Sequence, residues 1–285
     1  MKNLVQLLTI ITLIIHSLTT NAQSLLWEIS GNGLKKPSYI YGTIHLICPN
    51  ELVISDALIQ AFDRTDQLVL ELDMDAPDFM QKAQKLSLNP SMENLSNQLN
   101  VDNKKLINSF LQKNFKTDLT QLGILKPFAL QSMVLMKTLE CQQPASYESS
   151  FIQLAKEQKE EILGLEEMED QFKIFDEIPQ KKQVEWLVEN IKNFTNTKKE
   201  MQEILKAYEN EDLKKIQEIT IQNPQYKEYL DLFLTDRNKK WAPKIETIAK
   251  TKPTLFGVGA AHLIGKNGVI ELLKNKGYKL KPIEQ

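Results

Sequence analysis

The sequence lacks the features of several protein classes. Aromatic residues make up 7% of its 285 residues and there is no Cys-x-x-Cys-His motif, so a haem pocket is not favoured. Basic and acidic residues nearly cancel to a net charge of -2 without a basic stripe, which argues against nucleic acid as a partner. Beyond the N-terminus, no apolar run approaches the length of about 20 residues that a membrane-spanning helix needs.

The N-terminus predicts a secretory signal peptide. Lys2 precedes the largely apolar run Leu4–Ile15, and small or polar residues follow as far as Ala22. The run is too short to span a bilayer comfortably, and no cysteine lies nearby for lipid attachment. We expect cleavage after Ala22 and one domain over residues 23–285, exported to a periplasm or secreted from the cell.

Two cysteines remain after this cleavage, Cys48 and Cys141. An even number in an exported protein predicts one disulfide, which would fix the loop that carries His45. Two separate buried thiols are one alternative. A metal site formed by Cys48 and His45 is another, although it would leave Cys141 without a role.

The hydrophobic pattern predicts an α/β fold. The first two predicted strands read as a hairpin around Gly31-Asn32-Gly33, and the last two enclose a helix as a βαβ unit. Between them, residues from about 78 to 250 are mostly helical, forming a large insertion. The predicted strands are 25–29, 39–45, 67–73, 161–166, 254–259 and 278–283. The predicted helices are 55–64, 102–114, 127–140, 149–157, 179–212, 225–232, 240–251 and 268–276.

Histidine is rare, and its placement is informative. His16 lies in the predicted signal peptide, while His45 and His262 each follow a strand in a Gly-x-x-His frame that begins at Gly42 and Gly259. Open α/β sheets bind ligands just past the carboxyl ends of their strands. We therefore predict that the two frames lie on neighbouring strands, with the imidazoles about 3–5 Å apart if they share a metal. The alternative is that each glycine forms a simple turn at a strand end.

Carboxylates follow other predicted strands. Glu71 ends the apolar strand 67–73, which we expect beside the strand of His45, and Asp73 should point to the same face as Glu71. Glu166 ends the strand 161–166. Two imidazoles with one or two carboxylates suit Zn²⁺, Mn²⁺, Co²⁺ or Fe²⁺. Arg237, predicted between two helices, would stabilise an oxyanion or form a surface salt bridge.

Five motifs occur in order over residues 25–283, and together they resemble the TraB/GumN family, which includes the Tiki metalloproteases. They are Gly42–His45, Leu70–Asp73, Gly164–Glu166 with Gln171, Arg237-Asn238, and Gly259–His262. The resemblance implies a mixed sheet flanked by helices, similar to erythromycin esterases and the haem-binding ChaN proteins. It also implies that Glu71 is the acidic partner of the paired histidines, and that the activity is peptide-bond cleavage with Mn²⁺ or Co²⁺.

The sequence thus favours a metal-dependent, peptidase-like hydrolase with a peptide or protein substrate. His45 and His262 would bind the metal, and Glu71 would complete the coordination or act as general base. Glu166 and Arg237 would orient the substrate or support the ligands. The alternative is a protein that binds haem or an iron chelate through the same histidines without hydrolysis. A degenerate family member that serves as a scaffold is a third possibility.

Overall fold

The computed structural model describes residues 24–285. The predicted signal peptide, residues 1–22, lies outside this range. No helix within the described residues has both the length and the apolar character that crossing a bilayer requires.

Six strands of the described chain form one mixed sheet in the order β4-β3-β5-β2-β1-β6. β1 is antiparallel to β2 and β6, whereas β5 is parallel to β2 and β3, and β3 is parallel to β4. The predicted mixed α/β class and the hairpin are therefore confirmed. β5 and β6 run in the same direction, as the predicted βαβ unit requires, but β2 and β1 lie between them in the sheet. The strands are β1 (Leu26–Gly31), β2 (Ser38–Thr43), β3 (Gln67–Leu70), β4 (Glu161–Gly164), β5 (Leu255–Gly259) and β6 (Tyr278–Ile283).

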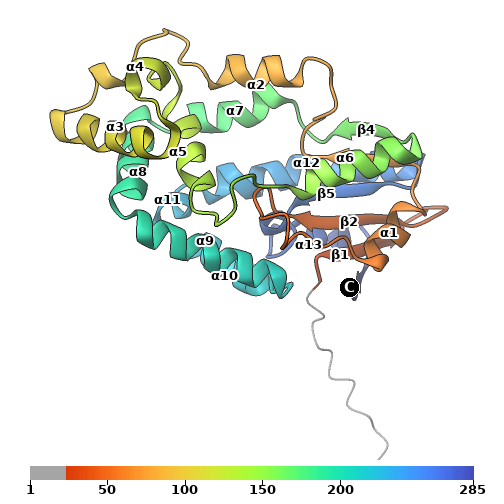
Figure 1. Ribbon diagram of the computed structural model, residues 1–285. Helices are drawn as coiled ribbons and strands as arrows, with labels where there is room; N and C mark the ends of the chain where they lie inside the picture. The colour runs from red at the N-terminus through yellow and green to blue at the C-terminus, as the bar shows by residue number, and fades with distance from the viewer. Residues whose placement is uncertain (1–23) are drawn as a thin grey trace, which may run out of the picture.

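Helices occupy most of the chain between β3 and β5, as predicted. In Figure 1, α2, α3, α4, α5, α7 and α8 gather beside the sheet, at the left of the view. The helices are α1 (Asp56–Phe62), α2 (Phe79–Ser87), α3 (Val101–Phe115), α4 (Leu119–Leu122), α5 (Pro127–Met136), α6 (Tyr147–Gln158), α7 (Met168–Asp176), α8 (Gln180–Lys192), α9 (Phe194–Glu209), α10 (Leu213–Gln222), α11 (Pro224–Lys227), α12 (Asp236–Thr251) and α13 (Val269–Asn275).

Both faces of the sheet are covered. On one face, the ring of Phe151 in α6 lies 5.4 Å from the ring of Tyr41, and its Cδ2 lies 3.3 Å from where a Cβ of Gly257 would be. Successive residues of a strand point to opposite faces, so Gly42 faces the other way, toward Leu263. All four residues of β3 are buried, as its uniformly apolar core predicts for a strand between two layers of helices.

The register of β2 and β5 brings the two Gly-x-x-His frames together. In this parallel pair, Gly42 lies opposite Val258, and Thr43 lies opposite Gly259. The prediction that the two strands are neighbours is confirmed. Both strands end at the same edge of the sheet, where His45 and His262 follow.

The position of Glu71 differs in two respects from the prediction. β5 lies between β2 and β3, so the strand that leads to Glu71 is not beside the strand that leads to His45. Strands that follow one another in sequence are adjacent only about two-thirds of the time, and here a later strand pairs with both. In addition, β3 ends at Leu70, so the alternation of side chains does not extend to Asp73, which is exposed.

Two helical boundaries also differ. The stretch predicted as one helix, 179–212, divides at Asn193, whose φ of -103° and ψ of 32° lie outside the helical region. Arg237 was predicted at a join between helices but lies in the first turn of α12. The π-helical segment Asp231–Thr235 precedes it, and the backbone N–H of Asp236 donates to Asp231, so the chain stays helical through this region.

Candidate functional site

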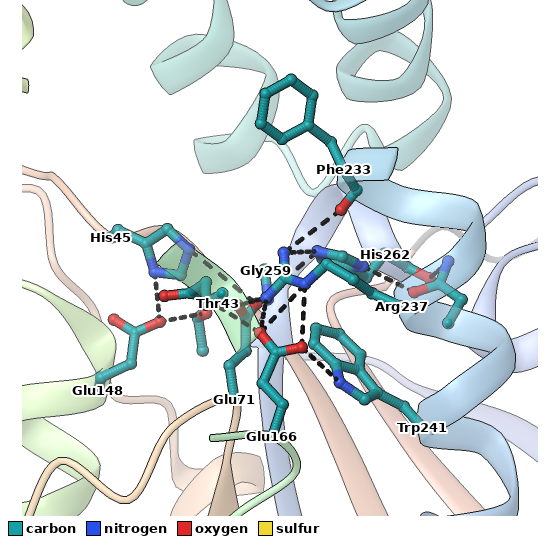
Figure 2. A network of polar contacts seen from close by, with 12 residues as sticks. Thr43, His45, Glu71, Glu148, Glu166, Phe233, Arg237, Trp241, Gly259 and His262 are labelled. Atoms are coloured by element: carbon teal, nitrogen blue, oxygen red, sulfur yellow. Dashed lines mark hydrogen bonds and ion pairs between the residues drawn. The ribbon is translucent and has the colours of Figure 1, made fainter. Parts of the chain in front are cut away.

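The candidate site lies at the carboxyl ends of β2, β3 and β5. His45 follows β2 by two residues, Glu71 directly follows β3, and His262 ends the short 3₁₀ turn η4 (Ala260–His262) after β5. Oε1 of Glu71 lies 4.0 Å from Nε2 of His45 and 3.9 Å from Nε2 of His262. The structure therefore brings three of the predicted site residues, from both ends of the chain, around one carboxylate oxygen (Figure 2).

The two glycines of the frames permit close approach rather than an unusual backbone turn, since neither has a positive φ. The N–H of Gly259 donates to Oε1 of Glu71 at 2.8 Å. A Cβ on Gly259 would lie 3.3 Å from that oxygen and 3.6 Å from Nε2 of His45 and Cδ2 of His262. A Cβ on Gly42 would lie 2.7 Å from Leu263. Gly259 thus leaves the site open, and Gly42 lets β2 pack on the turn that carries His262.

His262 is buried and neutral. Its Nδ1 lies 2.6 Å from Oδ1 of Asn238, so Nδ1 carries the proton and Nε2 has the lone pair. Arg237 donates from Nη1 to this Nε2 at 3.1 Å. Burial lowers the pKa of His262 to about 3, and the charge of Arg237 acts in the same direction against the attraction of Glu71. The approach of His262 to Glu71 is therefore not an ion pair.

His45 differs in exposure and in charge. Its side chain is 62% exposed, and its Nδ1 lies 2.8 Å from Oε1 of the buried Glu148. Desolvation works to lower the pKa of His45, but Glu148, and then Glu71, outweigh it and raise the pKa to about 9. Water screens part of this attraction, because the ring is open to solvent. The ring is protonated at neutral pH and donates from Nδ1.

Arg237 is buried between two carboxylates. Its Nη2 lies 2.6 Å from Oε2 of Glu71 and 2.6 Å from Oε1 of Glu166, and 11% of its side chain is exposed. Nε2 of Gln171 donates to the same two oxygens at 3.2 Å, and Nε1 of Trp241 donates to Oε2 of Glu166 at 3.2 Å. Desolvation works to raise the pKa of Glu71, but Arg237, followed by the two imidazoles and the N–H of Gly259, outweighs it and holds the pKa at about 2. A surface salt bridge, one of the two predicted roles of Arg237, is excluded.

A comparison with protein families matches residues 25–282 to the TraB/PrgY/gumN family. The chain belongs to this family. No curated protein and no solved structure matches it. The family match spans every site residue named above, in agreement with the resemblance seen in the sequence motifs. Membership of the TraB/PrgY/gumN family by itself does not assign a substrate or a metal.

Three residues of this TraB/PrgY/gumN site were absent from the predicted set. Asn238 stood in a quoted motif but had no assigned role, and it now fixes the tautomer of His262. Trp241 lies one helical turn after Arg237, and its ring centroid is 4.5 Å from that of His262. Glu148 lies 103 residues after its partner His45 and carries no local motif. Its one sequence signal is its position near the start of a helix soon after Cys141.

The predicted disulfide between Cys48 and Cys141 is confirmed, with Cα atoms 5.7 Å apart and 93 residues between them in sequence. It joins the loop after His45 to the chain before α6. Both alternatives for the cysteines, separate thiols and a metal site with Cys48, are excluded.

The donor types at the site suit a divalent cation. Each histidine binds a neighbour through Nδ1 and turns Nε2 toward Glu71, as metal-binding histidines do when an outer residue orients them. Within residues 24–285, however, no three His, Cys, Asp or Glu side chains are already drawn together at metal-binding distances. A cation would also have to compete with Arg237 at Nε2 of His262 and with the proton on His45. The residues fit a metal chemically, and binding requires these adjustments.

Proposed function

We propose that the chain is an exported hydrolase that cleaves amide bonds in peptides or proteins, with a divalent metal held by His45, His262 and Glu71. The observation that carries the proposal is the approach of both Nε2 atoms to one oxygen of Glu71, at 4.0 Å and 3.9 Å. Imidazole and carboxylate donors with open positions are typical of hydrolytic metals. The family resemblance favours Mn²⁺ or Co²⁺, and the same donors also suit Zn²⁺ or Fe²⁺.

A bound metal would supply a Lewis acid and a water of lowered pKa. The protein's own groups supply the rest of the chemistry. Glu71 is a weak base because its pKa is held near 2, so it completes the coordination in this proposal rather than accepting a proton. His45 carries a proton at neutral pH, so its Nε2 has to lose that proton before it can bind the metal, and in this proposal His45 acts as a ligand rather than as a general acid.

Arg237 is the charge-stabilising group in this proposal. Its guanidinium is held by Glu71 and Glu166 and stacks on Trp241, with Cζ 4.5 Å from the ring centroid. Its N–H groups all have partners in the protein, so it would stabilise negative charge on the substrate carbonyl through its fixed positive charge. The Nη1 N–H that now faces His262 would become free to donate once a metal takes Nε2 of that ring. Glu166 and Gln171 keep it in place.

Export is supported by the sequence of the N-terminus and by the disulfide, because structural disulfides persist in oxidising compartments. The haem hypothesis receives less support. Nε2 of His262 faces a guanidinium and a carboxylate instead of an apolar cavity that could hold a porphyrin. No contact among the described residues favours the haem-binding alternative.

The proposal is tested with the mature protein from residue 23 and its His45→Ala and His262→Ala variants. We expect the wild type to bind one equivalent of Mn²⁺ or Co²⁺ and to hydrolyse members of a peptide library. Each variant should lose at least tenfold in metal affinity and at least tenfold in hydrolysis rate. Asp73→Asn is the matched control, because Asp73 is close in sequence to Glu71 but exposed. Metal content and hydrolysis that survive in both histidine variants would refute the proposal.

A further inference from the structure

We infer that Glu148 is the positioning residue of His45, and that the Cys48–Cys141 disulfide is the covalent tie that holds this pair in the site. The inference builds on the proposed function, because it concerns how one of the proposed metal ligands is aimed. It starts from the hydrogen bond of 2.8 Å between Nδ1 of His45 and Oε1 of Glu148.

Glu148 acts through His45 and Thr43. Its Oε1 accepts from the Thr43 hydroxyl at 2.5 Å and from His45, and among the described residues it forms no hydrogen bond or ion pair with Glu71 or Arg237. Figure 2 shows the carboxylate on the far side of the His45 ring from the Arg237 cluster. Glu148 is therefore placed to aim the ring rather than to contact a reacting group.

The burial of Glu148 makes this hydrogen bond specific. The residue is 5% exposed, and its Oε2 is buried without a partner in the described part of the chain. A buried carboxylate is costly unless it is paired and hydrogen-bonded, and among the described residues the side chains that hydrogen-bond to Glu148 are those of Thr43 and His45. The hydrogen bond therefore stabilises the buried carboxylate and also fixes the orientation of the His45 ring.

The orientation of the ring follows from this pairing. Nδ1 of the ring donates a hydrogen bond to Glu148, and this leaves Nε2 directed toward Glu71, at 4.0 Å from Oε1. Because 62% of the side chain is exposed, few other contacts hold the ring in place. Without Glu148 the ring is free to turn into solvent or to flip and present the other nitrogen.

Two links join the backbone segments that carry the pair. Ile47 and Ala145 exchange both backbone hydrogen bonds, at 3.1 Å and 2.8 Å, and the disulfide joins the next residue, Cys48, to Cys141. His45 lies two residues before the first link, and Glu148 lies three residues after it. When the disulfide is absent, this backbone bridge and the hydrogen bonds between the Tyr147 hydroxyl and the backbone of Val53 remain to keep the two segments in register.

The test uses imidazole ¹⁵N NMR, because the mature chain has two histidines and its spectrum therefore shows the signals of two rings. The signals that disappear in His45→Ala are those of His45. We expect Glu148→Ala to remove the exchange-protected Nδ1 proton of His45 and to leave that of His262 unchanged. Glu148→Gln should retain the signal, because its amide oxygen still accepts. Affinity for Co²⁺ alone should fall 10- to 100-fold in Glu148→Ala and less in Glu148→Gln, as for other residues that orient metal ligands.

Glu157→Ala is the matched control, because Glu157 lies on the exposed side of the same helix. A Glu148→Ala protein with the His45 signal and the Co²⁺ affinity of this control would overturn the inference. If Glu148→Ala does not fold, the Cys48→Ala/Cys141→Ala variant takes its place, and we expect a weakened His45 signal. An unchanged signal there would overturn the role of the disulfide. A wild type that binds no Co²⁺ would count against the proposed function, while the spectrum would still decide the role of Glu148.

Discussion

Nη1 of Arg237 lies 3.1 Å from Nε2 of His262, the nitrogen that would bind a metal. The guanidinium also neutralises the neighbouring carboxylates, with Nη2 2.6 Å from Glu71 and from Glu166. Arg237 therefore has two opposing effects on a cation. It holds the carboxylates of Glu71 and Glu166 in place, but it also occupies the lone pair on Nε2 of His262 and repels a cation by its positive charge.

We predict that Arg237→Met raises the affinity for Co²⁺ at least tenfold while it lowers activity by about 10²-fold or more. The buried carboxylates of Glu71 and Glu166 would attract a cation once their partner is gone, and the charge stabilisation of the reaction would be lost. Without metal, the variant should lose about 3–5 kcal/mol of stability, because it leaves buried charges unpaired. Calorimetric Co²⁺ titration and denaturant unfolding measure both effects. A loss of Co²⁺ affinity would contradict the competition.

Gly257 and Gly259 lie two residues apart on β5 and allow a second test. A Cβ on Gly257 would meet Leu70 at 2.8 Å in the core, whereas one on Gly259 would meet Glu71 and both histidines at 3.3–3.6 Å. We predict that Gly257→Ala costs about 1–3 kcal/mol of stability and leaves the Co²⁺ affinity of the folded protein unchanged. Gly259→Ala should do the reverse, with a tenfold or greater loss of affinity and a smaller loss of stability.

The same Co²⁺ titrations and unfolding curves serve both glycine variants, so each acts as the control for the other. Equal losses of affinity in the two variants would mean that the space around Gly259 has no special role at the site.

The site shows which contacts a sequence can predict. The paired Gly-x-x-His frames and Glu71 could be found because each directly follows an apolar strand, and strand ends meet at one edge of a sheet. The burial of Arg237 could not be predicted, because a charged residue at the start of a helix is usually solvated and its partner Glu166 is 71 residues away. Glu148 was out of reach for the same reason, since its contact with His45 spans 103 residues.

The order of the strands was equally hidden. β2, β3 and β5 are all short apolar strands, and nothing local in their sequences states that β5 pairs with both of the others. The disulfide was predictable because two cysteines in an exported chain allow a single pairing. Contacts between segments that are far apart in the sequence depend on how the elements pack, and the local pattern of a single sequence does not reveal this packing.

The disulfide should contribute strongly to stability. It closes a loop of 93 residues, and a loop of this length restricts the unfolded chain by an amount on the order of 4 kcal/mol. We predict that reductant, or the Cys48→Ala/Cys141→Ala variant, lowers the free energy of unfolding by a few kcal/mol. Urea unfolding with and without reductant measures this. The double variant is the control for reductant, since it should show no further loss when reductant is added.

Glu71 should make stability depend on acid pH. Its pKa falls from 4.5 to about 2 in the folded protein, so its contribution is fully present above pH 4.5 and is lost as the pH falls through 2. The shift corresponds to about 3 kcal/mol. We predict that the metal-free wild type loses more stability between pH 4.5 and 2 than Glu71→Gln, which cannot titrate there. Denaturant unfolding in this range, in the presence of a chelator, gives the two slopes. Parallel curves would show that Arg237 does not hold the Glu71 carboxylate in its charged form.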